Sequence, residues 1–311
     1  MKKVSIMVPC YNEEENVVAM SEALVAQMEA LPQYDYEVLF IDNASTDHTR
    51  SLLREICRKN EKIKAIFNAK NFGQFNSPYY GICQTTGDCT ISICCDFQDP
   101  VEMIPKFLAE WEKGSKIVIG IKTSSRENRL TYLLRSAYYK MIRKLSRIEQ
   151  IEHFTGFGLY DGSFVEVLRT LDDPTPFLRG IVAELGFGLS LIEYEQPRRR
   201  AGKTSNNFLT LYDAAMLSFT SYTKLGVRLA ELIGVLMSAG SALIALIFVI
   251  LKLTVAPAFL GMPTAWVLLA LFFLGGLQLF FCGLVGEYAV STNTRMMKRP
   301  LVVEKERVNF K

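Results

Sequence analysis

Two long apolar runs near the carboxyl terminus constrain this chain more than any other feature of its sequence. Leu229–Leu251 has a single charged residue, Glu231, and Thr264–Tyr288 has a single charged residue, Glu287. A helix over either run is long enough to cross a bilayer. The connection Lys252–Pro263 is too short for a domain, so we expect a transmembrane helical hairpin over 229–290, with spans at 229–251 and 264–288. A buried hydrophobic hairpin in a soluble protein is the alternative.

Basic residues predict how this hairpin is oriented. The connection contains Lys252 alone, whereas the outer ends of the hairpin are flanked by Lys224, Arg228, Arg295, Lys298 and Arg299. Because positively charged flanks stay on the cytoplasmic side, we expect both termini and residues 1–205 to be cytoplasmic. The sequence therefore predicts an integral membrane protein whose residues 291–311 form a cytoplasmic tail.

Residues 206–228 lie between the first domain and the hairpin and have an amphipathic pattern. Phe208, Leu211, Tyr212, Ala215 and Phe219 recur at three- and four-residue spacing. A helix of this kind lies in the membrane interface or packs against a neighbouring domain. The sequence leaves both interpretations open, and we define the segment as an interfacial helix.

Residues 1–205 have the pattern of an α/β domain. Short β-branched runs alternate with helical patterns such as Glu14–Leu31 and Thr46–Lys59. This alternation predicts a largely parallel sheet covered on both faces, with ligands bound at the carboxyl ends of the strands. The expected strands are Val4–Val8, Glu37–Ile41, Ile63–Phe67, Thr90–Cys94, Ile117–Ile121 and Leu189–Glu193.

Composition argues against two functional classes. A net charge of +3 is too small for a general nucleic-acid binder. The chain has 7 cysteines but no Cys-x-x-Cys pair, and its 2 histidines are His48 and His153. We therefore expect reduced thiols and no zinc site.

Acidic residues follow two of the expected strands. Asp42 ends the second strand, where a carboxylate accepts hydrogen bonds from a ribose hydroxyl or a base N–H. Ser45 and Asp47 are better explained as helix caps. After the fourth strand, Cys94, Asp96 and Gln98 are two residues apart and share one side of an extended segment. A carboxylate and an amide oxygen suit Mg²⁺, which completes its shell with phosphate and water.

Asp99 has two interpretations. Asp99-Pro100-Val101-Glu102 has the form of a helix N-cap, with Pro at the first helical position and Glu two residues later. The same carboxylate also lies in the acidic cluster that follows the fourth strand. The sequence leaves capping and function equally open for Asp99.

Taken together, these motifs resemble the family 2 glycosyltransferases. Within that family the chain is similar to the polyisoprenyl-phosphate glycosyltransferases, relatives of dolichol-phosphate mannose synthase whose closest members carry two C-terminal spans. The resemblance implies a glycosyltransferase A-type nucleotide-sugar domain. It covers nearly the whole chain and depends on Val8-Pro9-Cys10-Tyr11-Asn12-Glu13-Glu14, Asp42, Asn71-Phe72-Gly73 with Gly87-Asp88, Asp96-Phe97-Gln98-Asp99-Pro100, Gly286-Glu287-Tyr288 and Arg299-Pro300.

The resemblance also implies roles for matching residues. The nucleotide would be held by Pro9, Tyr11, Asn12, Glu13 and Asp42, and the metal, Mg²⁺ or Mn²⁺, by Asp96 and Gln98. The candidate catalytic residues are Asp96, Asp99 and Asp161. The acceptor phosphate would be met by Lys122, Arg126, Arg135, Arg200 and Lys203, the last two in the family's mobile acceptor loop. Alternatively, the run Arg198–Arg200 binds anionic lipid headgroups.

Three positions depart from the family pattern. Cys94 stands where the family usually has Asp, and a soft thiol is a poor ligand for Mg²⁺ or Mn²⁺. Gly156 replaces the usual Asp of an Asp-Phe-Arg motif, which leaves no family-assigned base, although Asp161 or His153 is close in sequence. Ser205 or Asn206 stands where the acceptor loop usually carries Lys.

The function implied is inverting transfer of one sugar from a nucleotide-diphosphate sugar, such as UDP-glucose, to a polyprenyl phosphate such as undecaprenyl phosphate. The expected partners are this donor, the lipid and the membrane, without nucleic acid; a homo-oligomer is left open. A processive polysaccharide synthase is one alternative, but Gln196-Pro197-Arg198-Arg199 is not followed by Trp. The other is a non-catalytic membrane scaffold, which Cys94 and Gly156 keep open.

Overall fold

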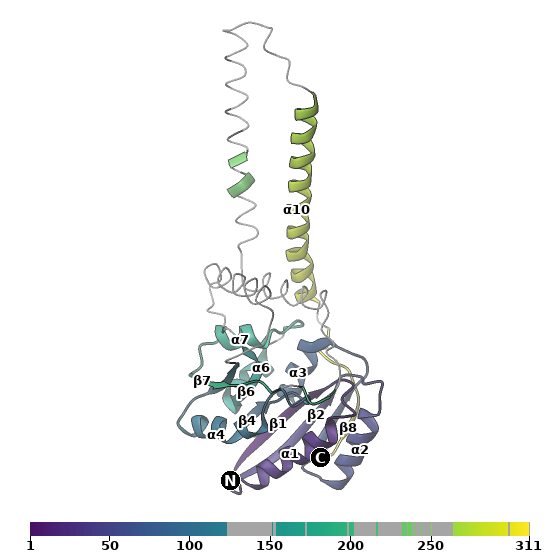
Figure 1. The fold of residues 1–311 in the computed structure, drawn as a ribbon, viewed down its shortest axis with the longest axis vertical. Helices are drawn as coiled ribbons and strands as arrows, with labels where there is room; N and C mark the ends of the chain where they lie inside the picture. The colour runs from purple at the N-terminus through teal and green to yellow at the C-terminus, as the bar shows by residue number, and fades with distance from the viewer. Residues whose placement is uncertain are drawn as a thin grey trace.

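An eight-stranded sheet forms the centre of the part of the chain that the structure describes (Figure 1). The structure is a computed structural model, and it describes residues 1–122, 151, 154–171, 173–197, 199–201, 264–297 and 299–310, with residue 216 and isolated residues between 232 and 250. The elements are β1 (Lys2–Cys10), α1 (Val17–Glu29), β2 (Tyr34–Asp42), α2 (Thr49–Lys59), β3 (Ile63–Asn68), α3 (Gly73–Cys83), β4 (Cys89–Ser92), η1 (Val101–Met103), α4 (Ile104–Glu112), β5 (Ile117–Lys122), β6 (Phe154–Asp161), α6 (Gly162–Thr170), α7 (Leu178–Glu184), β7 (Leu189–Tyr194), α10 (Thr264–Met296) and β8 (Glu304–Val308).

The strands lie in the order β7-β5-β6-β4-β1-β2-β3-β8. Strands β4, β1, β2 and β3 run parallel, as do β5 and β7, whereas β6 and β8 pair antiparallel with their neighbours. All six expected strands are present, so the prediction of a largely parallel α/β sheet is confirmed. The sequence missed β6, which contains two glycines, and β8, whose residues are mostly charged.

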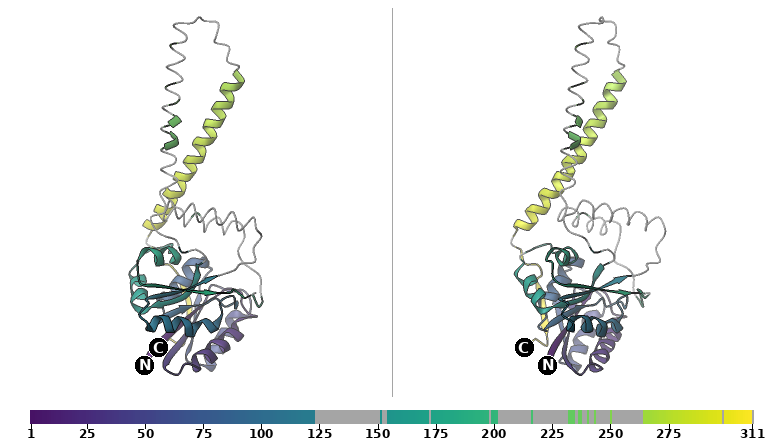
Figure 2. Two further views of the ribbon diagram at one scale, coloured as in Figure 1. Left: turned by 60° about the vertical axis from the view of Figure 1, so that its left-hand side comes forward. Right: turned by 90° about the vertical axis from the view of Figure 1, so that its left-hand side faces the viewer.

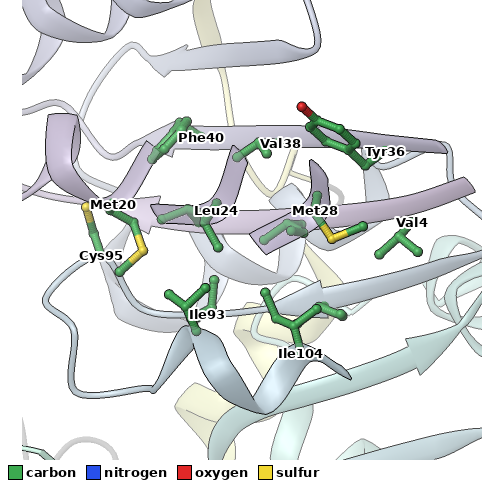
Figure 3. Close-up of a cluster of buried hydrophobic side chains, with 14 of the residues drawn as sticks. Val4, Met20, Leu24, Met28, Tyr36, Val38, Phe40, Ile93, Cys95 and Ile104 are labelled. Atoms are coloured by element: carbon green, nitrogen blue, oxygen red, sulfur yellow. The ribbon is translucent and has the colours of Figure 1, made fainter. Parts of the chain in front are cut away.

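Helices cover both faces of the sheet, and alternation along β1 separates the two cores. Ile6 and Val8 join the core under α1, α2 and α4, whereas Met7 joins the core under α3, α6 and α7. Figure 3 shows the first core, where Met20, Leu24 and Met28 of α1 pack onto strand residues. Fully buried side chains on both faces explain why these strands are nearly continuous apolar runs.

One described helix is long and apolar enough to cross a membrane, the segment Phe273–Thr294 of α10. The helix stands away from the sheet domain, on the side of α3, α6 and α7 (Figures 1 and 2). Many of its described large apolar side chains are exposed, among them Phe273, Leu279 and Phe280, as expected of a lipid-facing helix. The second predicted span, 264–288, lies within α10. The first span, 229–251, and the interfacial segment, 206–228, lie almost wholly outside the described residues, so the hairpin stays a prediction.

The end of the chain is part of the sheet domain. Within the segment 291–311, expected as a tail, residues 291–296 complete α10 and Glu304–Val308 form β8, which pairs antiparallel with β3. The Asn309 side chain donates to the carbonyl oxygens of Cys57 and Ile63, at 2.6 and 2.7 Å. Hence α10 is connected to the sheet directly at its carboxyl-terminal end.

Candidate active site at the carboxyl edge of the sheet

The carboxyl ends of β1, β2 and β4 meet at one edge of the sheet. In the parallel register Cys10 lies beside Asp42, and Met7 lies beside Ser92 at the end of β4. The segments that follow these strands therefore start side by side. Most of the described residues predicted for nucleotide and metal binding lie on these segments.

The loops after β1 and β2 are hydrogen-bonded to each other. Asn12, with a φ of 54° in the left-handed region, donates its amide to Ser45 Oγ, and its own side-chain oxygen accepts from the amide of Thr46 at 2.8 Å. The amide of Glu13 donates to Thr49 Oγ1 at 2.9 Å. Asn12 tolerates this backbone geometry better than most side chains. The interlocked loops leave Tyr11 exposed at the edge.

Ser45 and Asp47, expected as helix caps, differ in what they do. Asp47 accepts from the amide of Thr49 at the start of α2 and from the amide of Glu14. Ser45 instead joins the two loops through Asn12. The capping interpretation thus fits Asp47 but not Ser45.

Asp42 is fully buried at the end of β2 and forms an ion pair. Its Oδ2 lies 2.6 Å from Nε of Arg50, whose Nη2 donates to the carbonyl oxygen of Asn68 at 2.6 Å. The amide of Ser45 also donates to the carboxylate. Arg50 therefore compensates a buried charge that would otherwise be costly. It also ties β2, α2 and β3 together below the loops.

Asp96 lies at the centre of the site, but not by the route we predicted. Buried Ile93 and Cys95 point into the core under α1, which directs Cys94 and Asp96 the other way. However, β4 ends at Ser92 and the backbone turns at Phe97, with a φ of 60°. Gln98 therefore does not continue an extended segment, contrary to our prediction. Its backbone amide folds back and donates to Asp96 Oδ1 at 3.1 Å.

The second carboxylate oxygen of Asp96 is paired with an arginine. Nε and Nη2 of Arg199 lie 2.9 and 2.7 Å from Asp96 Oδ2. Among the described residues there is no cluster of three or more His, Cys, Asp or Glu side chains that would hold a metal by themselves. One carboxylate and one amide nevertheless suit Mg²⁺ or Mn²⁺, which take phosphate and water as remaining ligands. The arginine on Asp96 shows that this oxygen accommodates positive charge.

Asp99, three residues after Asp96, is buried and does not cap a helix. Its Oδ2 accepts from the amide of Cys94 at 3.0 Å, and its Oδ1 accepts from Tyr194 Oη at 3.1 Å. Burial raises the pKa of the Asp99 carboxyl, while the charge of Lys122 lowers it. Lys122, at the end of β5, therefore lies in the same electrostatic environment as Asp99 and Cys94, and its contact with the acceptor phosphate stays a prediction.

Glu13 brings a second carboxylate close to Asp96. Its Oε2 accepts from Asn16 Nδ2 at 2.7 Å. Burial and the negative charge of Asp96 raise the pKa of Glu13, whereas Asn16 and the charge of Arg199 lower it. Asn16 is buried and its Oδ1 has no partner among the described residues. Two carboxylates and one arginine therefore share this corner of the site.

Asp161, predicted as a catalytic residue, lies at the opposite edge of the sheet. It pairs with Cys89 at the start of β4, whereas Asp96 follows the end of that strand. Its carboxylate accepts from Ser163 at the start of α6, from Trp111 Nε1 at 2.7 Å and from Lys116 Nζ at 3.0 Å. The reason is that β6 runs antiparallel to β4 and returns the chain to the amino edge. We remove Asp161 from the site.

The basic residues predicted for the acceptor are only partly described. Lys122 lies at the site, and the guanidinium of Arg200 lies over the Phe97 ring at 5.2 Å. Arg126, Arg135 and Lys203, like His153, lie outside the described residues. Gly156 lies near the start of β6 with a φ of 105°, a conformation that disfavours the aspartate usual at this position.

Sequence reasoning missed three residues of this site: Arg199, Arg50 and Tyr194. Arg199 belongs to a run of three arginines, and spacing alone does not say which of them reaches Asp96. Arg50 is the second residue of α2, the helix that follows the Asp42 loop. An arginine eight residues after the acid was therefore the available signal in the sequence. Tyr194 ends a strand that does not neighbour β4, and no local pattern connects it to Asp99.

Comparisons with known proteins show what the chain is similar to. The family model described as Glycosyl transferase family 2 matches residues 5–169. A relative named prophage bactoprenol glucosyl transferase homolog, from Escherichia coli K12, is 28% identical over 97% of this chain and 98% of its own length. Bactoprenol glucosyl transferase of Shigella phage SfX is 29% identical over 98% of this chain and 99% of its own.

Two further proteins are informative. The uncharacterized glycosyltransferase YkoT of Bacillus subtilis is 30% identical over 96% of this chain and 89% of its own length. Among solved structures, mannosyl-3-phosphoglycerate synthase from Rubrobacter xylanophilus is similar with a TM-score of 0.50, at 14% identity over 69% of this chain and 71% of that one. At this identity the likeness supports the fold of the sheet domain alone.

Proposed function

The chain belongs to the family 2 glycosyltransferases, and we propose that it transfers one glucose from a nucleotide-diphosphate sugar to a polyprenyl phosphate. The observation that carries the proposal is similarity over almost the full length of relatives named bactoprenol glucosyl transferase. Those names favour glucose as the sugar and a polyprenyl carrier as the acceptor. A carboxyl-edge site in a chain that also has a helix long and apolar enough to cross a membrane supports the same interpretation.

The donor would lie across the carboxyl ends of β1, β2 and β4. In this arrangement Asp42, buried and held by Arg50 and by the amide of Ser45, would support the nucleoside pocket from below the loops. Pro9, Tyr11, Asn12 and Glu13 line the adjacent loops. We place the metal, Mg²⁺ or Mn²⁺, on Asp96 and Gln98; when bound, it supplies positive charge to the leaving diphosphate.

The chemistry does not require a protein base. A phosphate monoester has a second pKa of about 6, so at neutral pH the acceptor is largely a dianion and already a nucleophile. Lys122 and Arg200 would orient it and balance its charge, together with Arg126, Arg135 and Lys203 outside the described residues. Gly156 therefore removes no essential step. Attack on the face of the sugar opposite the diphosphate inverts the anomeric carbon. We assign Asp99 a structural role, as a buried carboxylate that holds the segment after β4 in place.

The pairing of β8 with β3 supports the predicted membrane hairpin. If α10 spans the bilayer, its carboxyl-terminal end lies on the same side as the sheet domain, because β8 follows within a few residues. Its amino-terminal end then lies on the other side. The chain must therefore cross the membrane once more between residues 201 and 264. We propose the run 229–251 for this crossing, with the sheet domain in the cytoplasm.

A direct assay tests the proposal. Purified full-length protein is incubated in detergent with undecaprenyl phosphate, Mn²⁺ and, separately, UDP-glucose, UDP-galactose, UDP-N-acetylglucosamine and GDP-mannose. Mass spectrometry of the lipid is expected to show one added hexose with UDP-glucose. A ladder of hexoses would indicate a processive enzyme instead. Absence of any glycolipid with every donor, from protein that still binds nucleotide, would favour a non-catalytic scaffold, which Cys94 in place of a metal ligand otherwise keeps open.

A further inference from the structure

Arg199 has an unexpected position for a residue of a basic loop. Its guanidinium places both Nε and Nη2 on a single oxygen of Asp96, at 2.9 and 2.7 Å, while Gln98 donates to the other oxygen. Asp96 is buried, and the Arg199 side chain is 28% exposed. Arg199 therefore occupies Oδ2, the carboxylate oxygen of Asp96 that the Gln98 amide leaves for a cation.

The backbone around Arg199 is attached to the site only weakly. The amide of Arg200 donates to the carbonyl oxygen of Asp96 at 3.4 Å, and Asn16 Nδ2 donates to the carbonyl oxygen of Ala201 at 3.4 Å. Both bonds are near the upper limit of hydrogen-bond length and contribute little. Among the described residues 199–201, the ion pair with Asp96 is thus the shortest polar contact with the site.

Charge balance explains why a cation is needed at this position. Glu13 and Asp96 are close enough that the charge of Asp96 raises the pKa of Glu13, and the charge of Arg199 opposes that shift. Without Arg199, the buried Asp96 carboxylate would lose the cation that pairs with it. A divalent cation on Asp96 restores the balance equally well, so the arginine and the metal are alternative partners for the same group.

We propose that Arg199 is a further residue of the donor site, which occupies the metal position on Asp96 until a metal–nucleotide complex displaces it. The inference rests on the proposed function for the identity of that complex. Once displaced, the guanidinium lies next to two negatively charged phosphates and forms a new pair with the diphosphate. Metal alone must break the Arg199–Asp96 pair without compensation, whereas metal with nucleotide restores a partner to Arg199. Metal and nucleotide are therefore expected to bind cooperatively.

Mn²⁺ binding, followed by electron paramagnetic resonance of the full-length protein in detergent, tests the exchange without any catalytic readout. In the absence of nucleotide, Arg199→Gln is expected to bind Mn²⁺ about tenfold more tightly than wild type. This is the lower end of what a charge-assisted hydrogen bond contributes, since Arg199 is partly exposed. Arg200→Gln is the matched control, because the Arg200 side chain lies over Phe97 and reaches Asp96 only through its backbone. It is expected to change Mn²⁺ affinity by less than about twofold.

Two further measurements separate exchange from a general effect of charge. With UDP present, wild type should gain more Mn²⁺ affinity than Arg199→Gln, because only wild type recovers a partner for Arg199. In an Asp96→Asn background, Arg199→Gln should leave the remaining Mn²⁺ affinity nearly unchanged, as a double-mutant cycle requires.

Equal Mn²⁺ affinities for wild type and Arg199→Gln without nucleotide would overturn the proposal, as would an equal gain in Arg200→Gln or no Mn²⁺ binding by any protein. The glycolipid assay separates this result from the proposed function. Tighter Mn²⁺ binding by Arg199→Gln in a protein that forms no glycolipid supports the exchange and refutes the transferase. Glycolipid formation without any difference in Mn²⁺ affinity refutes the exchange and supports the transferase.

Discussion

Buried carboxylates at the two edges of the sheet are held in different ways. At the amino edge, Glu37 of β2 accepts from Ser5 Oγ at 2.6 Å, from Nζ of Lys3 and Lys64 at 2.8 Å each, and from the amide of Thr86 at 2.7 Å. At the carboxyl edge, Arg199 is the one side-chain partner of Asp96 among the residues that the structure describes. The amino edge is saturated by groups fixed in the sheet, whereas the carboxyl edge has a partner that can be replaced.

The pKa values follow the same division. Burial alone would raise the pKa of Glu37, but Lys3, Lys64 and Ser5 outweigh it and bring the value to about 2. The pKa of Asp161 is likewise brought to about 2, against burial, by Ser163, Trp111 and Lys116. At the carboxyl edge, burial raises the pKa of Asp99 and of Glu13. Saturated carboxylates thus stabilise the fold, and under-compensated ones leave room for a ligand.

Removing the exchangeable carboxylate should produce the largest effect. Asp96→Asn is expected to lower kcat/KM for glucosyl transfer by two to three orders of magnitude, or about 2.7–4 kcal/mol, because charge stabilisation at the leaving diphosphate is lost. Unfolding by urea should change little. Steady-state kinetics and denaturation of the same preparation check both. Wild-type kinetics in Asp96→Asn, in the presence of chelator, would remove the metal from the mechanism.

Removing Glu37, the carboxylate with several fixed partners, should lower stability and leave activity unchanged. Glu37→Gln leaves Lys3 and Lys64 without their buried partner and is expected to lower the free energy of unfolding by about 3 kcal/mol, at the lower end for a buried pair since both lysines are partly exposed. The kcat per folded molecule should stay at the wild-type value, because Glu37 lies at the far edge from Asp96. A loss of kcat larger than the loss of folded protein would contradict the division between the two edges.

Stability in acid should distinguish the two edges, because the pKa shifts of their carboxyl groups have opposite signs. Glu37 and Asp161 ionise near pH 2 in the fold, against ordinary values of about 4.3 and 3.9, so the unfolded state binds more protons between these limits. Their stabilisation is present above about pH 4.5 and is lost as the pH falls towards 2. Asp99 has the opposite sign, since its raised pKa makes the folded state the better proton binder. Between pH 6 and pH 3, the urea midpoint should depend less on pH in Glu37→Gln than in wild type. Asp99→Asn should show no such reduction.

The smallest effect is expected where a carboxylate is well paired but exposed. Glu306 of β8 accepts from Nε and Nη2 of Arg54, the latter at 2.6 Å, but the two side chains are 37% and 34% exposed. Glu306→Gln should therefore lower the free energy of unfolding by less than about 1 kcal/mol, and the effect should shrink in 1 M salt. If Glu306→Gln lowered the free energy of unfolding as much as Glu37→Gln, pairing without burial would be sufficient to stabilise the fold.

Much of the fold could be predicted from the sequence because its signals are local. The alternation of β-branched and helical runs located all six expected strands, and the apolar run after Thr264 located α10. Asp42 and Asp96 could be placed at one edge because the carboxyl ends of parallel strands meet there. Strand β8 escaped prediction since Glu304–Val308 has one apolar residue, and an edge strand needs little burial on its outer side.

The sequence by itself determined which residues are available: an acid after each of two parallel strands, a run of arginines, and an apolar helix next to a charged end. Only the tertiary structure decided that Arg199 is the arginine on Asp96, that Asp161 lies at the far edge, and that the chain returns from α10 to the sheet. The physical reason is that periodicity reports which face of an element is buried, whereas partners across the sheet depend on strand order and direction. The antiparallel strands β6 and β8 determine the position of Asp161 and the return of the chain from α10. No pattern within either strand specifies its neighbour.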